Sequence, residues 1–197
     1  TSIINWFEKN PPLGGLGKIK LAEALLEQGK IKEVEILVRE GWTTAEISKN
    51  DLGYYRAKFK KFLSSEDHLK RADYLAWERK HWDLKRMLKY LPKDERALYN
   101  ARQILMSNSY GVDNAIAKVP NHLKNDPGLE FERLRWRNRR GRLESSLEIL
   151  YKNSNKTERQ MIRPDLWWEQ RKSVARSLIY KKRYKTAYKI SSEHSLS

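Results

Sequence analysis

The chain contains no cysteine among its 197 residues, which excludes disulfide bonds and thiolate metal sites. No apolar run approaches the roughly 18 residues that a membrane-spanning helix needs, so we expect no membrane span. The four histidines, His68, His81, His122 and His194, include no pair spaced at i and i+4, which argues against a zinc site. We therefore expect neither a metal nor a cofactor.

Glycine and proline are also scarce, with nine and six residues, and they punctuate the sequence instead of filling it. One glycine-rich stretch, residues 14–18 (GGLGK), resembles part of a phosphate-binding loop. That loop requires four residues between its glycines and a Ser or Thr after the lysine, whereas Ile19 follows Lys18 here. We interpret the stretch as the entry to a helix.

Basic residues outnumber acidic ones by 41 to 25, which gives a formal net charge of +16. The excess is uneven: the first 50 residues hold seven groups of each sign, whereas Arg171 to Lys189 holds eight basic groups and no acidic one. Such a balance indicates an acidic partner, which could be nucleic acid, anionic lipid or another acidic polymer. A solvated helix face without a partner fits the same charge pattern.

Apolar residues recur at helical spacing, and the predicted helices come in pairs. One period runs from Leu21 to Leu25, stops at Gly29 and restarts at Ile31, and similar hairpins are predicted over residues 134–150 and 174–188. The repeats are irregularly spaced, which argues against a strict tetratricopeptide array. We predict an all-α fold: one continuous domain over residues 1–197, forming an irregular, right-handed α-superhelix of about ten to twelve helices.

Several helix starts are marked by proline next to an acidic residue. Proline lacks the amide hydrogen that a first helical turn leaves unpaired, and acidic side chains suit the positive end of a helix. This chemistry predicts helix starts near Pro92, at Asp126-Pro127 and at Arg163-Pro164-Asp165.

A set of short motifs covers nearly the whole chain. They are residues 10–13 (NPPL), 21–26 (LAEALL), 65–77 (SEDHLKRADYLAW), 101–102 (AR), 111–120 (GVDNAIAKVP), 126–133 (DPGLEFER), 135–137 (RWR), 163–171 (RPDLWWEQR), 175–176 (AR) and 186–188 (TAY). In this order they are similar to the superhelical domain of the soluble lytic murein transglycosylases, periplasmic enzymes that cleave the glycan strands of peptidoglycan. The resemblance places Ala187 and Tyr188 at the packing face of the last helix.

The resemblance implies a non-catalytic platform that positions peptidoglycan for a separate C-terminal catalytic domain of the same parent chain. The family's catalytic glutamate precedes a serine in a lysozyme-like domain, and that domain's companion motif is absent here. The one Glu-Ser pair, Glu144-Ser145, falls on a predicted repeat helix, which offers no cleft for a general acid. We therefore expect a non-enzymatic fragment of a periplasmic protein, with its export signal outside this sequence and further helices after Glu193-His194.

Candidate contacts to glycan or another polyanion combine arginine with tryptophan. They are Arg135, Trp136, Arg139, Trp167, Trp168 and Arg171. A core position is favoured for Trp136 over base stacking. Trp167 and Trp168 point about 100° apart on a helix, so one could pack in the core while the other lines an inner rim, although structural roles for both are favoured. The alternative function is an α-solenoid scaffold for an acidic protein or nucleic acid, with nucleic acid the less expected partner.

Overall fold

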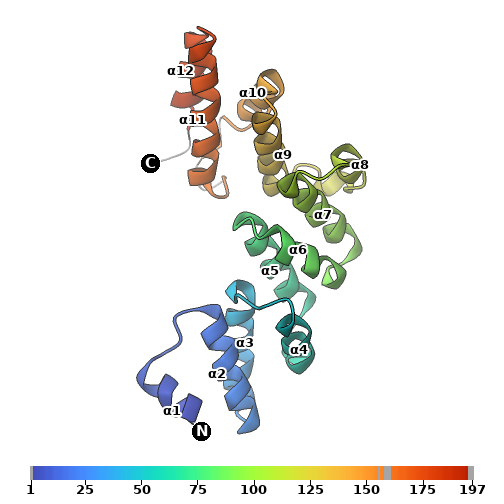
Figure 1. Cartoon of the computed structure of the whole chain (residues 1–197), viewed down its shortest axis with the longest axis vertical. Helices are drawn as coiled ribbons and strands as arrows, with labels where there is room; N and C mark the ends of the chain where they lie inside the picture. The colour runs from blue at the N-terminus through green and yellow to red at the C-terminus, as the bar shows by residue number, and fades with distance from the viewer. Residues whose placement is uncertain (1, 155, 158–160, 195–197) are drawn as a thin grey trace. The chain divides into compact units, whose positions relative to one another are not determined.

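The computed structural model describes residues 2–154, 156–157 and 161–194. Regular structure in these residues is entirely helical, with twelve α-helices, three short 3₁₀-helices and no strand (Figure 1). The prediction of an all-α chain with about ten to twelve helices is confirmed.

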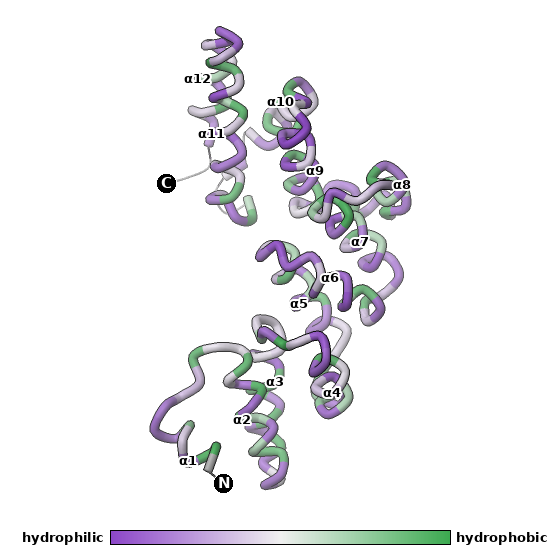
Figure 2. The backbone as a smooth tube through the Cα atoms, viewed as in Figure 1, coloured by the Kyte–Doolittle hydropathy of each residue, from purple (hydrophilic) through white to green (hydrophobic). Residues whose placement is uncertain are grey.

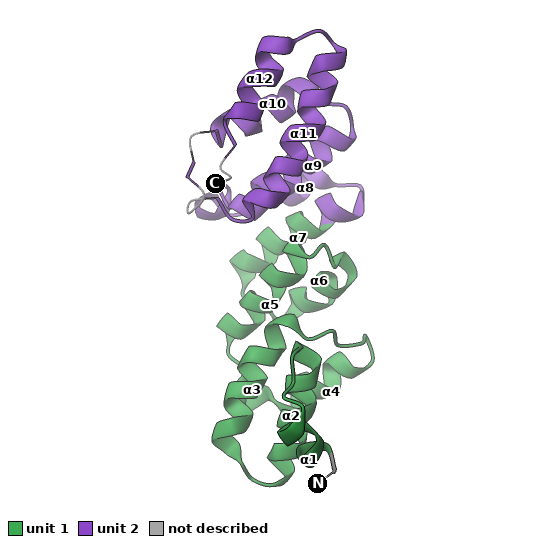
Figure 3. Ribbon diagram, turned by 90° about the vertical axis from the view of Figure 1, so that its left-hand side faces the viewer, with its two compact units in different colours: residues 1–103 green, residues 104–197 purple. Residues whose placement is uncertain are grey.

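The chain divides into two compact units, residues 1–103 and residues 104–197 (Figure 3). The first unit contains α1 (Ser2–Lys9), α2 (Gly15–Glu27), α3 (Ile31–Thr44), α4 (Asp51–Lys58), η1 (Lys60–Phe62), α5 (Ser65–Trp77), α6 (His81–Met87), η2 (Leu88–Tyr90) and most of α7 (Lys93–Ser107). The second contains the end of α7, then α8 (Val112–Ala117), η3 (Asn121–Leu123), α9 (Pro127–Arg139), α10 (Leu143–Lys152), α11 (Pro164–Tyr180) and α12 (Tyr184–Ser192). The single continuous domain stays a prediction.

Each unit has its own core, built from the apolar stripes of amphipathic helices (Figure 2). In the first unit α3 packs against both α2 and α5, and Trp42 and Phe59 are fully buried. In the second unit α9 packs against α10 and α11, which brings Phe131 of α9 onto Trp167 of α11 with their ring centroids 5.5 Å apart. The two large aromatic residues fix how α9 and α11 sit against each other.

Two glycines allow α2 and α3 to cross closely. A Cβ on Gly15 would lie 2.4 Å from the backbone nitrogen of Ala45, and one on Gly41 would lie 2.8 Å from the carbonyl oxygen of Gly15. Both distances are far below a normal contact, so only glycine fits at either position. The glycine-rich stretch at residues 14–18 therefore has a packing role: as expected, it begins a helix, α2.

Four helix pairs are joined by the same short turn, in which one residue adopts a left-handed conformation and a basic residue follows it. The left-handed residues are Gly29, Arg79, Gly141 and Lys182, with φ between 57° and 74°. The basic residues are Lys30, Lys80, Arg142 and Arg183, and each is the N-cap of the next helix. In every case the amide of the basic residue bonds back to a carbonyl five residues earlier, which is the hydrogen bond of a left-handed helix ending.

Candidate functional site

The candidate contact residues all lie on α9 and α11 or at their ends, and α9 begins as the sequence predicts. Asp126 is its N-cap, with a side-chain oxygen that accepts a hydrogen bond from the Leu129 amide at 2.8 Å, and Pro127 is the first helical residue. Pro164 likewise begins α11, while Pro92 immediately precedes α7. All three predicted helix starts are confirmed.

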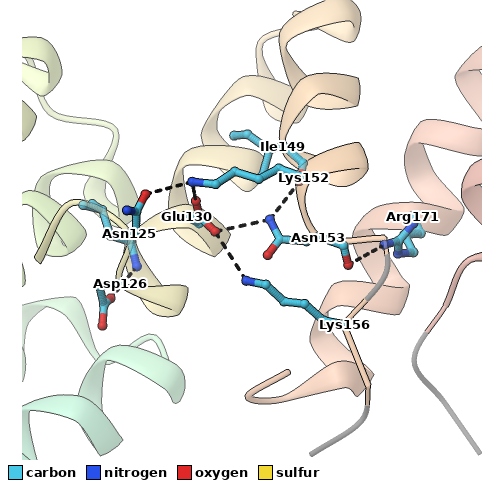
Figure 4. Close-up of polar contacts among 9 residues, drawn as sticks. Asn125, Asp126, Glu130, Ile149, Lys152, Asn153, Lys156 and Arg171 are labelled. Atoms are coloured by element: carbon cyan, nitrogen blue, oxygen red, sulfur yellow. Dashed lines mark hydrogen bonds and ion pairs between the residues drawn. The ribbon is translucent and has the colours of Figure 1, made fainter. Parts of the chain in front are cut away.

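A buried carboxylate, Glu130, ties α9 to α10 (Figure 4). Its residue is 3% exposed, and its two oxygens accept hydrogen bonds from the Lys152 ammonium and from the Asn153 side-chain amide, the latter at 3.2 Å. The Lys156 ammonium lies 3.9 Å away. Lys152 also donates to the Asn125 side chain at 2.9 Å, just before α9 begins. These partners offset the cost of burying a charged carboxylate.

Asn153 also links α10 to α11 by hydrogen bonds. Its side-chain amide also donates to the Ile149 carbonyl at 2.9 Å, which closes the end of α10. Its own carbonyl accepts a hydrogen bond from Arg171 at 3.4 Å (Figure 4). A second nitrogen of Arg171 donates to the Ile190 carbonyl at 2.9 Å. The guanidinium therefore binds the carbonyl ends of α10 and α12 together, where the helix dipoles place partial negative charge. Burial lowers the pKa of Arg171.

Arg135 and Arg139 share one face of α9, as their spacing of four residues requires. With Asn138 of α9 and Gln170 and Ser173 of α11 they line a polar cavity of about 240 Å³. Asn138 donates to Gln170 across this cavity at 3.2 Å, and Arg139 donates to the Leu105 carbonyl at 2.8 Å. The structure thus brings two of the six candidate residues into one site, where amide and guanidinium donors predominate.

Trp136 points away from this cavity, because a step of one residue from Arg135 turns the helix by about 100°. Its ring carries the guanidinium groups of Arg140 and Arg142, 4.6 and 4.8 Å from its centroid. It lines a second cavity with Arg133 and Arg137, which share a face of α9 with each other because they are four residues apart. The sequence pattern favours a core position for Trp136, but the residue is only half-buried in the structure.

Trp167 and Arg171 have almost no exposed surface, at 1% each. Trp167 packs in the core against Phe131, and Arg171 is occupied by backbone carbonyls, so neither presents a surface to a polymer. Trp168 is half-buried beside the ring of His194, 5.2 Å away. Adjacent tryptophans therefore divide between core and surface, and Arg135, Trp136, Arg139 and Trp168 stay as candidate contacts.

The hairpin of α11 and α12 carries exposed tyrosines that the sequence analysis did not single out as contacts. Tyr180, Tyr184 and Tyr188 are 90%, 60% and 77% exposed. The expected packing face of α12 is confirmed for Ala187, which is buried, but is wrong for Tyr188. The physical reason is spacing: Ile190 and Ala187 form the buried stripe, three residues apart, and Tyr188 is turned about 100° away from Ala187. The sequence signal for these exposed tyrosines is the spacing of four residues between Tyr184 and Tyr188 within a basic segment.

Basic side chains surround these tyrosines. Arg176, Lys181, Lys182 and Lys185 are exposed and form no ion pair with any residue in the described ranges. Arg183 differs, since it pairs with Glu144 of α10. That carboxylate is solvent-exposed on the surface of α10, without the enclosed cleft that a general acid uses.

The histidines of the described residues have packing roles or lie at the surface. Nδ1 of His68 accepts a hydrogen bond from the Trp42 indole at 3.2 Å, and burial lowers the pKa of His68. Among residues 2–154, 156–157 and 161–194 no group of three or more His, Cys, Asp or Glu side chains is placed to hold a metal ion. None of the helices described there is both long and apolar enough to cross a membrane.

No family model, curated protein or solved structure matches this chain.

Proposed function

We propose that this chain is a non-catalytic superhelical platform of a periplasmic soluble lytic transglycosylase. In this role it holds peptidoglycan strands for cleavage by a C-terminal catalytic domain of the same parent chain. The ordered motifs of the sequence motivate the assignment, and the right-handed superhelical arrangement belongs to the proposal. The observation that carries the binding role is the α11–α12 hairpin, which exposes three tyrosines among four basic side chains that form no ion pair with the described residues.

This hairpin suits a polymer that has both rings and acidic groups. Tyrosine offers a flat, rigid apolar face to a sugar ring and a hydroxyl to its polar edge. Arg176, Lys181, Lys182 and Lys185 supply positive charge that no acidic residue of the described chain neutralises. Peptidoglycan presents sugar rings along its strands and free carboxylates on its peptides, so both kinds of side chain would find partners.

The polar cavity between α9 and α11 extends the same surface. Gln170 and Ser173, which line it, lie on the face of α11 that continues to Tyr180, because residues three, seven and ten positions apart lie on one side of a helix. At about 240 Å³ the cavity is too small for a strand and fits a single ring or substituent. Arg135 and Arg139 would then contact the polymer at one point while the tyrosines contact it at others.

A second candidate function is an α-solenoid scaffold that binds nucleic acid or an acidic protein. It is favoured by the same hairpin, since aromatic side chains between basic ones also suit stacked bases and phosphates. The two candidates differ in how they respond to salt. Binding that rests on phosphate neutralisation falls steeply as salt rises, whereas ring stacking and hydrogen bonding to sugars fall less.

The test is co-sedimentation of the chain with purified peptidoglycan sacculi at 50 mM and about 300 mM salt, with DNA as competitor. We expect retention that survives both salt and DNA. Replacing Tyr180, Tyr184 and Tyr188 by Ala should reduce retention at both salt concentrations. Replacing Lys181, Lys182 and Lys185 by Gln should reduce it mainly at low salt.

A matched control is replacement of the exposed Tyr54 in the first unit by Ala, which leaves the hairpin intact. Retention that disappears with salt and DNA would contradict the platform and favour the scaffold. A separate turnover assay on the same sacculi should give no released glycan, and release would overturn the non-catalytic assignment.

A further inference from the structure

We infer that the cavity between α8, α9 and the α9–α10 turn binds the carboxyl end of a short peptide with a small apolar last residue. This deepens the proposed function, on which it rests, because it names the part of the polymer that this second cavity would take. The cavity is distinct from the polar one described above.

Its walls have two different characters. Val112, Ile116 and Ala117 of α8 form an apolar side, together with Leu105. Arg133, Trp136 and Arg137 of α9 and Arg142 of the turn form the other side. The cavity holds about 250 Å³, near the lower limit for small-molecule sites, so it suits one amino-acid residue better than a sugar chain.

The three arginines differ in how much of their hydrogen-bonding capacity is already used. Arg137 donates to the Ser145 carbonyl at 2.6 Å and lies 3.5 Å from the Glu148 carboxylate. Arg142 stacks on the Trp136 ring. Arg133 forms no hydrogen bond or ion pair with the described residues, and its side chain is half-buried. Arg133 is therefore the arginine whose guanidinium N–H donors are all available to a ligand.

Two further observations indicate that the site favours an anionic ligand. The pKa of Arg137 is lowered first by burial and then by the positive charge of Arg133, so the two cations repel each other across the site. The indole nitrogen of Trp136 is shielded from solvent and donates to no described residue. A carboxylate would relieve the repulsion and could accept from both the guanidinium and the indole.

Asp113 favours a peptide over a simple anion as the ligand of this cavity. It lines the cavity and forms no ion pair with the described residues. A carboxylate beside the arginines disfavours phosphate, which carries up to two negative charges, but it can accept the backbone N–H that precedes a terminal carboxylate. The small apolar side chain would then lie against Ile116 and Ala117.

The larger cavity of the first unit, about 440 Å³, shows the contrast. There Lys80 pairs with Glu46, Arg86 pairs with Asp83, and Arg71 donates to the carbonyls of Trp42 and Ala45. Lys80, Arg86 and Arg71 each have a partner there, whereas Arg133 and Asp113 form no ion pair with the described residues.

The test uses N-acetylalanine as the probe and the indole N–H resonance of Trp136 as the reporter, identified by its loss in Trp136→Phe. We expect N-acetylalanine to shift this resonance in the ¹⁵N-labelled chain. N-acetylalaninamide, in which an uncharged amide replaces the carboxylate of the probe, should bind at least about tenfold more weakly, because a charge-assisted hydrogen bond is lost. Arg133→Ala should weaken binding by a similar factor, and Arg133→Lys should restore part of it.

Arg39→Ala is the matched control, since it removes an exposed arginine from α3 of the first unit and should leave the titration unchanged. Equal shifts with the amide, or an unaltered titration in Arg133→Ala, would overturn the inference. Inorganic phosphate that binds as tightly as N-acetylalanine would also overturn it and assign a general anion site. Sacculus retention is measured separately: its loss together with a persisting Trp136 shift would contradict the platform and leave this site standing.

Discussion

At the scale of single residues, the positions that matter most are charged groups held away from water. Glu130, Arg71, Arg102 and Arg171 are buried, and each binds a lysine, an aspartate or backbone carbonyls. None of these partners could be assigned from the sequence, because each lies at least 18 residues away along the chain. An arginine in an amphipathic helix predicts a solvated face, and burial becomes evident only when the neighbouring helix is in place.

Replacement of Glu130 by Gln is predicted to lower the free energy of unfolding by about 1–3 kcal/mol. The substitution keeps the shape and removes the charge that accepts from Lys152, and hydrogen bonds to charged groups contribute that much. Urea unfolding followed by circular dichroism measures the change. Glu144→Gln removes an exposed carboxylate paired with Arg183 and should have little effect. An equal loss in both variants would show that burial of Glu130 contributes nothing.

His68 is predicted to make stability fall as the pH drops below about 6.5, the ordinary pKa of histidine. Burial, and next the charge of Arg56, lower its pKa in the folded chain, and Arg71 acts in the same direction against Asp67. The unfolded state therefore binds a proton first, and stability present above pH 6.5 is lost down to the folded pKa.

The loss contributed by one such group cannot exceed about 1.4 kcal/mol per pH unit. Urea unfolding at pH 7.5, 6.5 and 5.5 measures it. In His68→Gln, which retains an acceptor for the Trp42 indole, the pH dependence in this range should become shallower. An unchanged slope would assign the effect to other groups.

At the scale of elements, the sequence predicted well wherever local chemistry decides. Asp126-Pro127 and Pro164 begin helices because their side chains act within one turn. It predicted less well where a helix face had to be chosen. Trp167 and Tyr188 each stand next to another aromatic or apolar residue of the same helix. Which of the two adjacent residues is buried depends on the neighbouring helix that packs against them. Of the candidate contacts, Arg135 and Arg139 meet in one cavity because they are spaced by four residues, which the sequence does show.

The turn between α11 and α12 offers a test of the shared hairpin geometry. Lys182 adopts φ of 57°, a conformation that costs about 1 kcal/mol for a residue with a Cβ. Lys182→Gly is therefore predicted to raise the unfolding free energy by about 0.5–1 kcal/mol, which urea unfolding can measure. Lys181→Gly provides the control, because Lys181 has φ of −84° and gains nothing. A loss of stability in Lys182→Gly would contradict the geometry.

At the scale of the whole molecule, a net charge of +16 works against the compact state through repulsion. We predict that the melting temperature rises by a few degrees as NaCl increases from 10 to 300 mM, since the Debye length shortens from about 30 Å to below 10 Å. A polyanion such as polyglutamate should raise it further at 10 mM NaCl by binding the folded chain. Differential scanning calorimetry measures both, and a melting temperature that falls with salt would show that ion pairs outweigh the repulsion.

The guanidinium of Arg171 has a consequence for a chain under tension. A force applied at the C-terminus would unwind residues 191–192 at the end of α12 and then meet the bond between Arg171 and the Ile190 carbonyl. To unravel further, the chain must leave a buried cation without one of its acceptors, which costs more than opening an ordinary helical turn. Arg171 thus resists further unwinding of α12. In a single-molecule pulling experiment, extension of α12 should pause at Ile190, and in Arg171→Met it should continue without a pause.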